Sequence, residues 1–374
     1  MSRTKNTFLF PIQVLLLIFV LTAMLIGGWA ALQRAGWDLP SLNPSLVGIH
    51  GVLMIGVFST LISLERAVAV AAMFNQTAWH WAYFAPLLSA IGVVMLILFG
   101  AHPVAKFALL AGSVWFVWVY VYTATKRHYW SLHTYILSLG AILLVIGNLA
   151  WALGSAIFIV VHLWIAFLVV TIVSERLELS RVRKLSANAE RLLLGALAIY
   201  SGGAVATLVN LGIGIRIVGV GMIVLALWLL KYDIARRAIH RQGLTRYIGW
   251  CMLIGYFWLS VGGMIAILVG AVYAGFQYDM LLHAVVVGFV FSMIFGHAPI
   301  IFPALTRREI RFSNLFYGCL VLLHVAVMIR IGSDISTNFD GRMWASLLNA
   351  VAVCLFLVLI PFHIKPNRVL GVGV

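Results

Sequence analysis

Residues 279–304 of this chain have the sequence DMLLHAVVVGFVFSMIFGHAPIIFPA. The stretch is long enough to cross a bilayer as a helix, since one crossing takes about 20 residues. Its only charged residue is Asp279, at the start, and it carries two histidines, His283 and His297. An imidazole finds few polar partners in hydrocarbon, so a histidine placed there tends to mark a functional site. The stretch therefore predicts a transmembrane helix that contributes to a site.

The composition of the whole chain points to the same class of protein. Of its 374 residues, 64% are hydrophobic and only 9% are charged, and the mean hydropathy is +1.09. A soluble domain of this length would carry roughly a quarter charged residues. The three cysteines lie in apolar runs without CxxC spacing, so neither a disulfide framework nor a zinc site is expected. We expect an integral membrane protein.

Apolar runs of crossing length predict an all-α polytopic protein with twelve transmembrane helices. We expect one integral-membrane helical domain over residues 1–374, with short connections throughout. The predicted spans are residues 8–32, 46–72, 79–101, 104–125, 132–153, 155–174, 190–210, 212–231, 247–272, 279–304, 313–332 and 343–363.

The basic residues predict the orientation of these spans. If both termini are cytoplasmic, all but five of the 25 lysines and arginines lie at inner loops and helix ends; the five are Arg34, Lys106, Arg216, Arg330 and Arg342. This distribution follows the positive-inside rule. It also accounts for the net charge of +15 through attraction to anionic lipid, so we expect a lipid bilayer and no nucleic acid as partner.

Two histidines are predicted at the same height below the outer surface. His50 lies at the outer end of the second span and His283 at the outer end of the tenth. Two axial ligands of one haem iron require such a placement. His297 is 14 residues beyond His283; at about 100° per residue it returns to nearly the same face, about 21 Å deeper.

Three further histidines have two interpretations each. His162 and His324 lie at intermediate depth in the sixth and eleventh spans, and together with His297 they are candidate ligands of a second haem or a metal. For His162 and His324 that metal would be copper. Alternatively, each forms a hydrogen bond across helices, or, for His297, serves a kink at Pro299.

Two acidic residues have open assignments as well. Asp279 precedes His283 by one helical turn, so it could orient the histidine ring through the second ring nitrogen. It could equally be an acidic residue placed to favour the helix dipole. Glu65 and Arg66 end the second span on the inner side, either as a local ion pair or as a point where cytoplasmic protons are taken up.

The helix number and the positions of His50 and His283 resemble the catalytic subunit of haem-copper oxidases and nitric oxide reductases. In that family, histidines on the second and tenth helices hold a low-spin haem, and His162 has a counterpart on the sixth. The chain departs from the pattern elsewhere. Position 285, where the oxidases carry a further haem-ligating histidine, is Val285, and residues 190–210 contain no histidine. A complete oxygen-reducing or nitric oxide-reducing centre of that type is therefore not expected.

The chain is also similar to NnrS-type membrane proteins, through His50-Gly51-Val52-Leu53-Met54 and His283-Ala284-Val285-Val286-Val287-Gly288. This resemblance implies a bacterial cytoplasmic-membrane protein that binds haem b and copper and takes part in the response to nitric oxide. A small gaseous ligand, and a protein that donates electrons, are the partners implied.

Two function classes follow. The first is a haem protein that transfers electrons or handles a small gas, with a possible oxidoreductase activity. The second is a proton-coupled transporter or channel that uses the intramembrane histidines. Cation coupling usually requires a buried carboxylate, and few acidic residues are expected inside the spans, so the first class is favoured. A subunit that only anchors partner proteins is a third interpretation.

Overall fold

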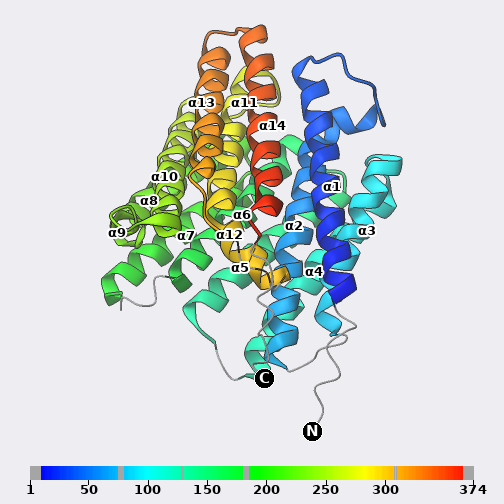
Figure 1. The fold of residues 1–374 in the computed structure, drawn as a ribbon. Coiled ribbons are helices and arrows are strands. Elements are labelled where there is room, and N and C mark those ends of the chain that lie inside the picture. Colours follow the sequence, from blue (N-terminus) through cyan, green and yellow to red (C-terminus); the bar gives the residue numbers. More distant parts are fainter. Residues whose placement is uncertain are drawn as a thin grey trace, which may run out of the picture.

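The computed structural model describes residues 10–74, 80–127, 130–179, 185–306, 308 and 310–364 (Figure 1). In these residues the only β-type pairing is an isolated bridge between Ile310 and Ile364. Twelve helices in the described part are long and apolar enough to cross a membrane. The predicted all-α class and the predicted number of spans are thus confirmed.

The helices follow the predicted spans closely, and most ends differ by a few residues. The first six spans are α1 (Phe10–Ala35), α2 (Ser45–Met73), α3 (Phe84–Phe99, preceded by the short helix η1, Trp81–Tyr83), α4 (Pro103–Lys126), α5 (Leu132–Ala152) and α6 (Ile157–Leu179). The others are α7 (Ala187–Ala206), α8 (Leu211–Tyr232), α10 (Gly243–Val269), the compound helix α11–η3–α12 (Gly275–Thr306), α13 (Leu315–Ile335) and α14 (Phe339–Phe362), with the short α9 (Ala235–Ala238) before α10.

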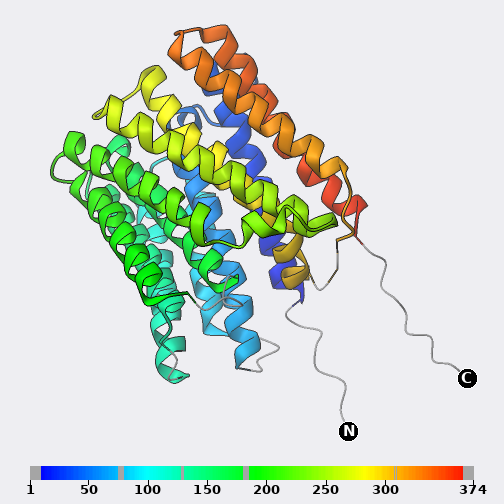
Figure 2. The ribbon, with the colours of Figure 1, turned by 90° about the vertical axis from the view of Figure 1, so that its left-hand side faces the viewer.

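Consecutive spans pack against each other along the chain, as in α1 with α2, α7 with α8 and α13 with α14. The start of α1 and the end of α14 lie at the same end of the bundle (Figure 1). We call this the inner end and the opposite one the outer end, after the predicted orientation. In the second view, the hairpin α7–α8 and the hairpin α13–α14 lie on opposite sides of the bundle (Figure 2).

Helix α6 lies at the centre of the bundle. In the most apolar stretch of 18 consecutive residues of α6, 78% of the residues are buried. This is the largest buried share among the twelve spans, and the share for α1 is 28%. Its sequence is apolar all round, as expected of a helix that packs on every side. It contacts α2, α5, α7, α8 and η3, so His162 is placed in the interior.

The tenth span is not the uniform α-helix that its spacing predicts. It begins as α11 (Gly275–His283), continues as the π-helix η3 (Ala284–Phe291) and ends as α12 (Ser292–Thr306). A π-helix bonds residue i to i+5 and so holds more residues in each turn than an α-helix. The 14 residues from His283 to His297 therefore do not return to one face, and that prediction is wrong.

Close backbone contact between α8 and α10 depends on glycine. A Cβ atom added to Gly219 would lie 2.6 Å from the carbonyl oxygen of Gly263, and one added to Gly263 would lie 2.6 Å from that of Gly219. No larger residue fits there without a shift. Small residues commonly permit such helix contacts in membranes, and Gly219 and Gly263 have this role between α8 and α10.

Candidate functional site

His50 and His283 are brought together at the outer end of the bundle. His50 lies near the start of α2, and His283 ends α11. Phe58 of α2 makes an edge contact with Phe291 of η3, the segment that follows α11, with ring centroids 5.7 Å apart. His50 has His283 among its electrostatic neighbours. The fold therefore places these two histidines, 233 positions apart in the chain, within electrostatic range of each other.

The ring of His283 is held through one nitrogen and leaves the other free. Its Nδ1–H donates to the backbone carbonyl of Asp279 at 2.8 Å, and Nε2 has no hydrogen bond to the described residues. Metal-ligating histidines are usually oriented in this way, with the second ring N–H on a carbonyl or carboxylate. For His50, Nδ1 is buried without a hydrogen-bond partner of normal geometry.

Asp279 orients His283 mainly through its backbone carbonyl, since its carboxylate Oδ1 lies 3.4 Å from the His283 Nδ1. The carboxylate is engaged by Arg330, whose Nε donates to Oδ2 at 2.6 Å and whose Nη2 donates to Oδ1 at 2.8 Å. The first turn of α11 contains no acidic residue, so the helix-dipole interpretation of Asp279 does not apply. Arg330, expected near the outer surface, is only 8% exposed.

A second aspartate beside this ion pair escaped the sequence analysis. The side chain of Asp334 is buried, and neither of its carboxylate oxygens has a hydrogen-bond partner. The predicted span 313–332 ends before it, whereas α13 continues to Ile335 and carries Asp334 into the bundle. A predicted span extended by one helical turn would have included Asp334.

His162 and His297 each keep a buried ring nitrogen without a partner. In His162 this atom is Nε2, and the residue is 3% exposed. In His297, Nδ1–H donates to the carbonyl of Met293 at 2.7 Å, which leaves Nε2 unpaired. The electrostatic neighbours of His297 include Arg176 and Asp233, so it belongs to a group of residues at the inner end, away from His283.

His324 differs, because both of its ring nitrogens are engaged. Trp258 Nε1–H donates to Nδ1 at 3.0 Å, and Nε2 lies 3.2 Å from the hydroxyl of Ser292. That hydroxyl donates to the carbonyl of Cys251 at 2.7 Å, which assigns the ring proton to Nε2. No lone pair is left for copper, and the arrangement is that of the hydrogen-bonding interpretation. No three His, Cys, Asp or Glu side chains in the described ranges form a group that could hold a metal ion.

The inner end holds two ion pairs that connect different helices. Arg66 Nη2 donates to Glu175 on α6 at 2.6 Å, so Arg66 pairs across helices and not with the adjacent Glu65, as the local ion pair required. Arg176 donates to both carboxylate oxygens of Asp233, at 2.8 and 2.9 Å, and the side chains of this pair are 3% and 1% exposed.

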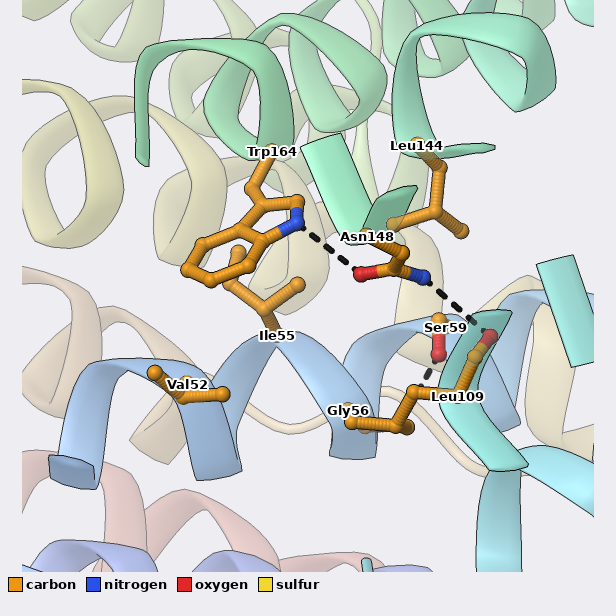
Figure 3. A pocket seen from close by; sticks show the side chains of 8 residues that line it. All are labelled: Val52, Ile55, Gly56, Ser59, Leu109, Leu144, Asn148 and Trp164. Carbon is orange, nitrogen blue, oxygen red and sulfur yellow. Dashed lines mark hydrogen bonds between the residues drawn. The ribbon is translucent and has the colours of Figure 1, made fainter. Parts of the chain in front are cut away.

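A small interior pocket lies between α2, α4, α5 and α6 (Figure 3). It has no space for even a water-sized sphere, whereas ligand sites typically have roughly 300–1,000 Å³. Asn148 crosses it: the side chain donates to the carbonyl of Leu109 and the hydroxyl of Ser113, and accepts from Trp164 Nε1–H. Asn148 thus fixes three helices together, as expected of a polar residue between spans.

Comparison with known proteins places the chain in a family. No curated protein matches the chain. The family described as a domain of unknown function (DUF8744) matches residues 13–363, and the chain therefore belongs to that family.

Proposed function

We propose that this protein is a haem-binding integral membrane protein in which His50 and His283 are the two axial ligands of a low-spin haem b near the outer surface. The single observation that carries the proposal is that these two histidines, at the start of α2 and the end of α11, lie within electrostatic range of each other. The Nδ1–H of His283 is occupied by the Asp279 carbonyl, so the lone pair of Nε2 is available to iron.

The charges around the two histidines suit the same cofactor. Arg34 and Arg330 are electrostatic neighbours of both His50 and His283. A haem carries two carboxylates, for which the Arg34 guanidinium would be the partner, since that of Arg330 already binds Asp279 and Ser346. When bound there, the haem would supply one-electron redox chemistry, and two axial imidazoles would leave no open position on its iron. We therefore assign electron transfer to this site.

Any handling of a gas such as nitric oxide needs a second centre, and His162 and His297 remain its candidates. Each has a buried ring nitrogen free of hydrogen bonds, as a ligand to a second haem or to copper requires. His324, with both nitrogens engaged, is left out. We place the protein in the bacterial cytoplasmic membrane with both termini inside, where an electron-donor protein would reduce it.

Visible spectroscopy of the purified protein from a haem-replete host tests the proposal. We expect a Soret band, sharp absorptions in the reduced state, and about one low-spin haem by pyridine haemochrome. His50→Ala and His283→Ala should each abolish the low-spin spectrum, because one axial ligand is lost. His102→Ala is the matched control, since His102 is exposed and caps α4; it should keep the spectrum. A colourless wild-type protein would refute the proposal.

One observation favours the second candidate function, a proton-coupled transporter. Contrary to expectation, the bundle buries carboxylates: Asp233 is 6% exposed and Asp334 is 4% exposed. Buried carboxylates are typical of proton pathways in transporters. Proteoliposomes containing a pH-sensitive dye would report proton flux, which Asp233→Asn or Asp334→Asn should reduce if this function holds. Unchanged flux in both variants would exclude it.

A further inference from the structure

The π-helix η3 directly follows His283, so its winding helps to decide the direction in which this histidine points. Helices of this type are rare in proteins. The eight residues Ala284–Phe291 have a uniformly apolar sequence, which does not itself require π-helical winding. The winding is therefore stabilised by contacts that η3 makes with neighbouring helices.

Helix α10 contacts η3 closely at two places. A Cβ atom added to Gly288, in the middle of η3, would lie 2.5 Å from Cγ of Trp258, so the indole packs directly on the backbone of η3. Nearer to His283, the side chain of Val285 packs on Gly262 in the same way. Trp258 is 4% exposed and Val285 is 1% exposed. Both contacts lie in the close-packed interior, where side chains have little room to shift.

The inner end of η3 is held by hydrogen bonds. Ser292 is the residue that follows η3, and its hydroxyl donates to the carbonyl of Cys251 on α10 at 2.7 Å. The same hydroxyl lies 3.2 Å from Nε2 of His324 on α13, from which it accepts. The tenth span is thus fixed to its neighbours at Ser292, at Gly288 and at Val285.

This winding determines how α11 is rotated relative to α12. Each hydrogen bond of a π-helix closes over one residue more than in an α-helix, so η3 takes about one residue more between the same ends. One residue corresponds to about 100° of rotation in an α-helix. If η3 became α-helical while Ser292 stayed in place, α11 would rotate by about that angle and His283 would turn away from His50.

We propose that Trp258 and Gly288 are positioning residues for His283: the indole, packed on the glycine, keeps η3 in its π-helical winding and so directs His283 toward His50. The ring has this role rather than its N–H, since Cγ and Cβ of Trp258 contact Gly288 whereas Nε1–H donates to His324. The consequence for haem binding rests on the proposed function, but the rotation of α11 does not depend on the cofactor.

The rotation of α11 can be measured in the haem-free protein with two spin labels. Gln277→Cys on α11 and Leu153→Cys at the end of α5 place them at exposed positions, and Cys354→Ser removes the exposed native cysteine. Double electron–electron resonance then gives the distance between the labels. We expect this distance to shift by several ångströms in Trp258→Leu, which removes the indole, and in Gly288→Ala, which adds a methyl group where the indole lies.

Two further variants separate the winding of η3 from a general loss of packing. Trp258→Phe is the matched control, because it keeps a ring on Gly288 and removes only the N–H; the label distance should stay at the wild-type value. Deletion of Val287 in the Trp258→Leu protein removes one residue from η3. An α-helix then fits between the same ends, so the deletion should restore the wild-type distance.

Visible spectra of the haem-loaded proteins should follow the same order. Trp258→Leu and Gly288→Ala should lose the low-spin spectrum, whereas Trp258→Phe and the variant with Val287 deleted should keep it. The reason is that only the first two turn His283 away from His50.

An unchanged label distance in Gly288→Ala would overturn the proposal, whether or not Trp258→Leu folds. A shift in Trp258→Leu that remains after deletion of Val287 would overturn it too, because the shift would then come from loosened packing. The expected label distances in a protein that never binds haem would instead support the positioning role and refute the proposed function.

Discussion

Two buried ion pairs, one near each end of the bundle, differ in how completely their polar atoms are satisfied. In the inner pair, Asp233 accepts two hydrogen bonds from Arg176 and a third from the backbone N–H of Ala235. In the outer pair, Arg330 is fully engaged, but the neighbouring Asp334 has no partner. The side chains are 3% and 1% exposed in the inner pair, against 9% and 18% in the outer pair.

The difference separates two uses of buried charge. The inner pair joins α6 to the segment after α8 and offers nothing to a ligand, since its hydrogen bonds are complete. The outer pair lies beside Nδ1 of His283, which is 3.4 Å from Asp279 Oδ1, and the side chain of Asp279 is 18% exposed. Unsatisfied polar groups that are buried cost free energy. Beside the outer pair these are the two oxygens of Asp334, whereas beside the inner pair the unpaired atom is Nε2 of His297 and not an atom of the pair itself.

The largest expected effect is on stability, and it should be unequal between the two pairs. Arg176→Met leaves Asp233 charged and buried, and should lower the free energy of unfolding by about 3–5 kcal/mol. Arg330→Met should cost less, about 1–3 kcal/mol, because the side chain of Asp279 is 18% exposed and keeps some contact with water, whereas that of Asp233 is 1% exposed. Unfolding in detergent, followed by circular dichroism, measures both.

The control for this pair of variants is Arg191→Met, which removes an exposed arginine of α7 and should change stability by less than about 0.5 kcal/mol. Equal losses in Arg176→Met and Arg330→Met would contradict the comparison. A loss in Arg330→Met that shrinks at low pH would sharpen it, because acid neutralises the aspartates that the arginine leaves behind.

The second prediction compares the effects of replacing His324 and His283 by leucine on stability and on the haem spectrum. His324→Leu removes the acceptor of Trp258 Nε1–H and should cost about 1–3 kcal/mol of stability while the haem spectrum is kept. His283→Leu should have the opposite result: the spectrum is lost, and the haem-free protein loses less than about 1 kcal/mol. A His324→Leu protein that folds normally but has lost its haem would show that the hydrogen bonds misidentify the ligands.

The sequence predicted the fold well, because hydrocarbon imposes a strong length and polarity rule on every span. The twelve spans and the short connections between them follow directly from the positions of the apolar stretches in the sequence. The π-helix is not, since the run Ala284–Phe291 is equally apolar in either helix type. The winding of the tenth span is decided by its contacts with α10, α13 and α6.

The candidate site was predictable only in part, for a related reason. A histidine inside an apolar run is conspicuous, so His50 and His283 could be named from the sequence. The charged partners were hidden: Arg330 is 51 residues from Asp279, and Asp233 is 57 residues from Arg176. Arg330 and Asp233 lie near predicted span ends, where charges are ordinary, and only packing shows that they turn inward.

The smallest expected effect concerns His80, a histidine outside the spans, whose protonation should change the stability of the protein with pH. His80 Nδ1 accepts from the backbone N–H of Ala82 at 3.2 Å, and the ring stacks on Phe74. Burial lowers the pKa of His80 below its ordinary value of about 6.5. The unfolded chain therefore takes up a proton before the folded one, and stability falls as the pH drops below about 6.5.

His80→Asn keeps a side-chain acceptor for the backbone N–H of Ala82 but does not titrate. The stability of this variant should therefore depend less on pH over that range. Thermal unfolding between pH 5 and pH 8 would measure the difference. A variant with an unchanged pH profile would contradict the prediction, because it would mean that folding does not change the pKa of His80.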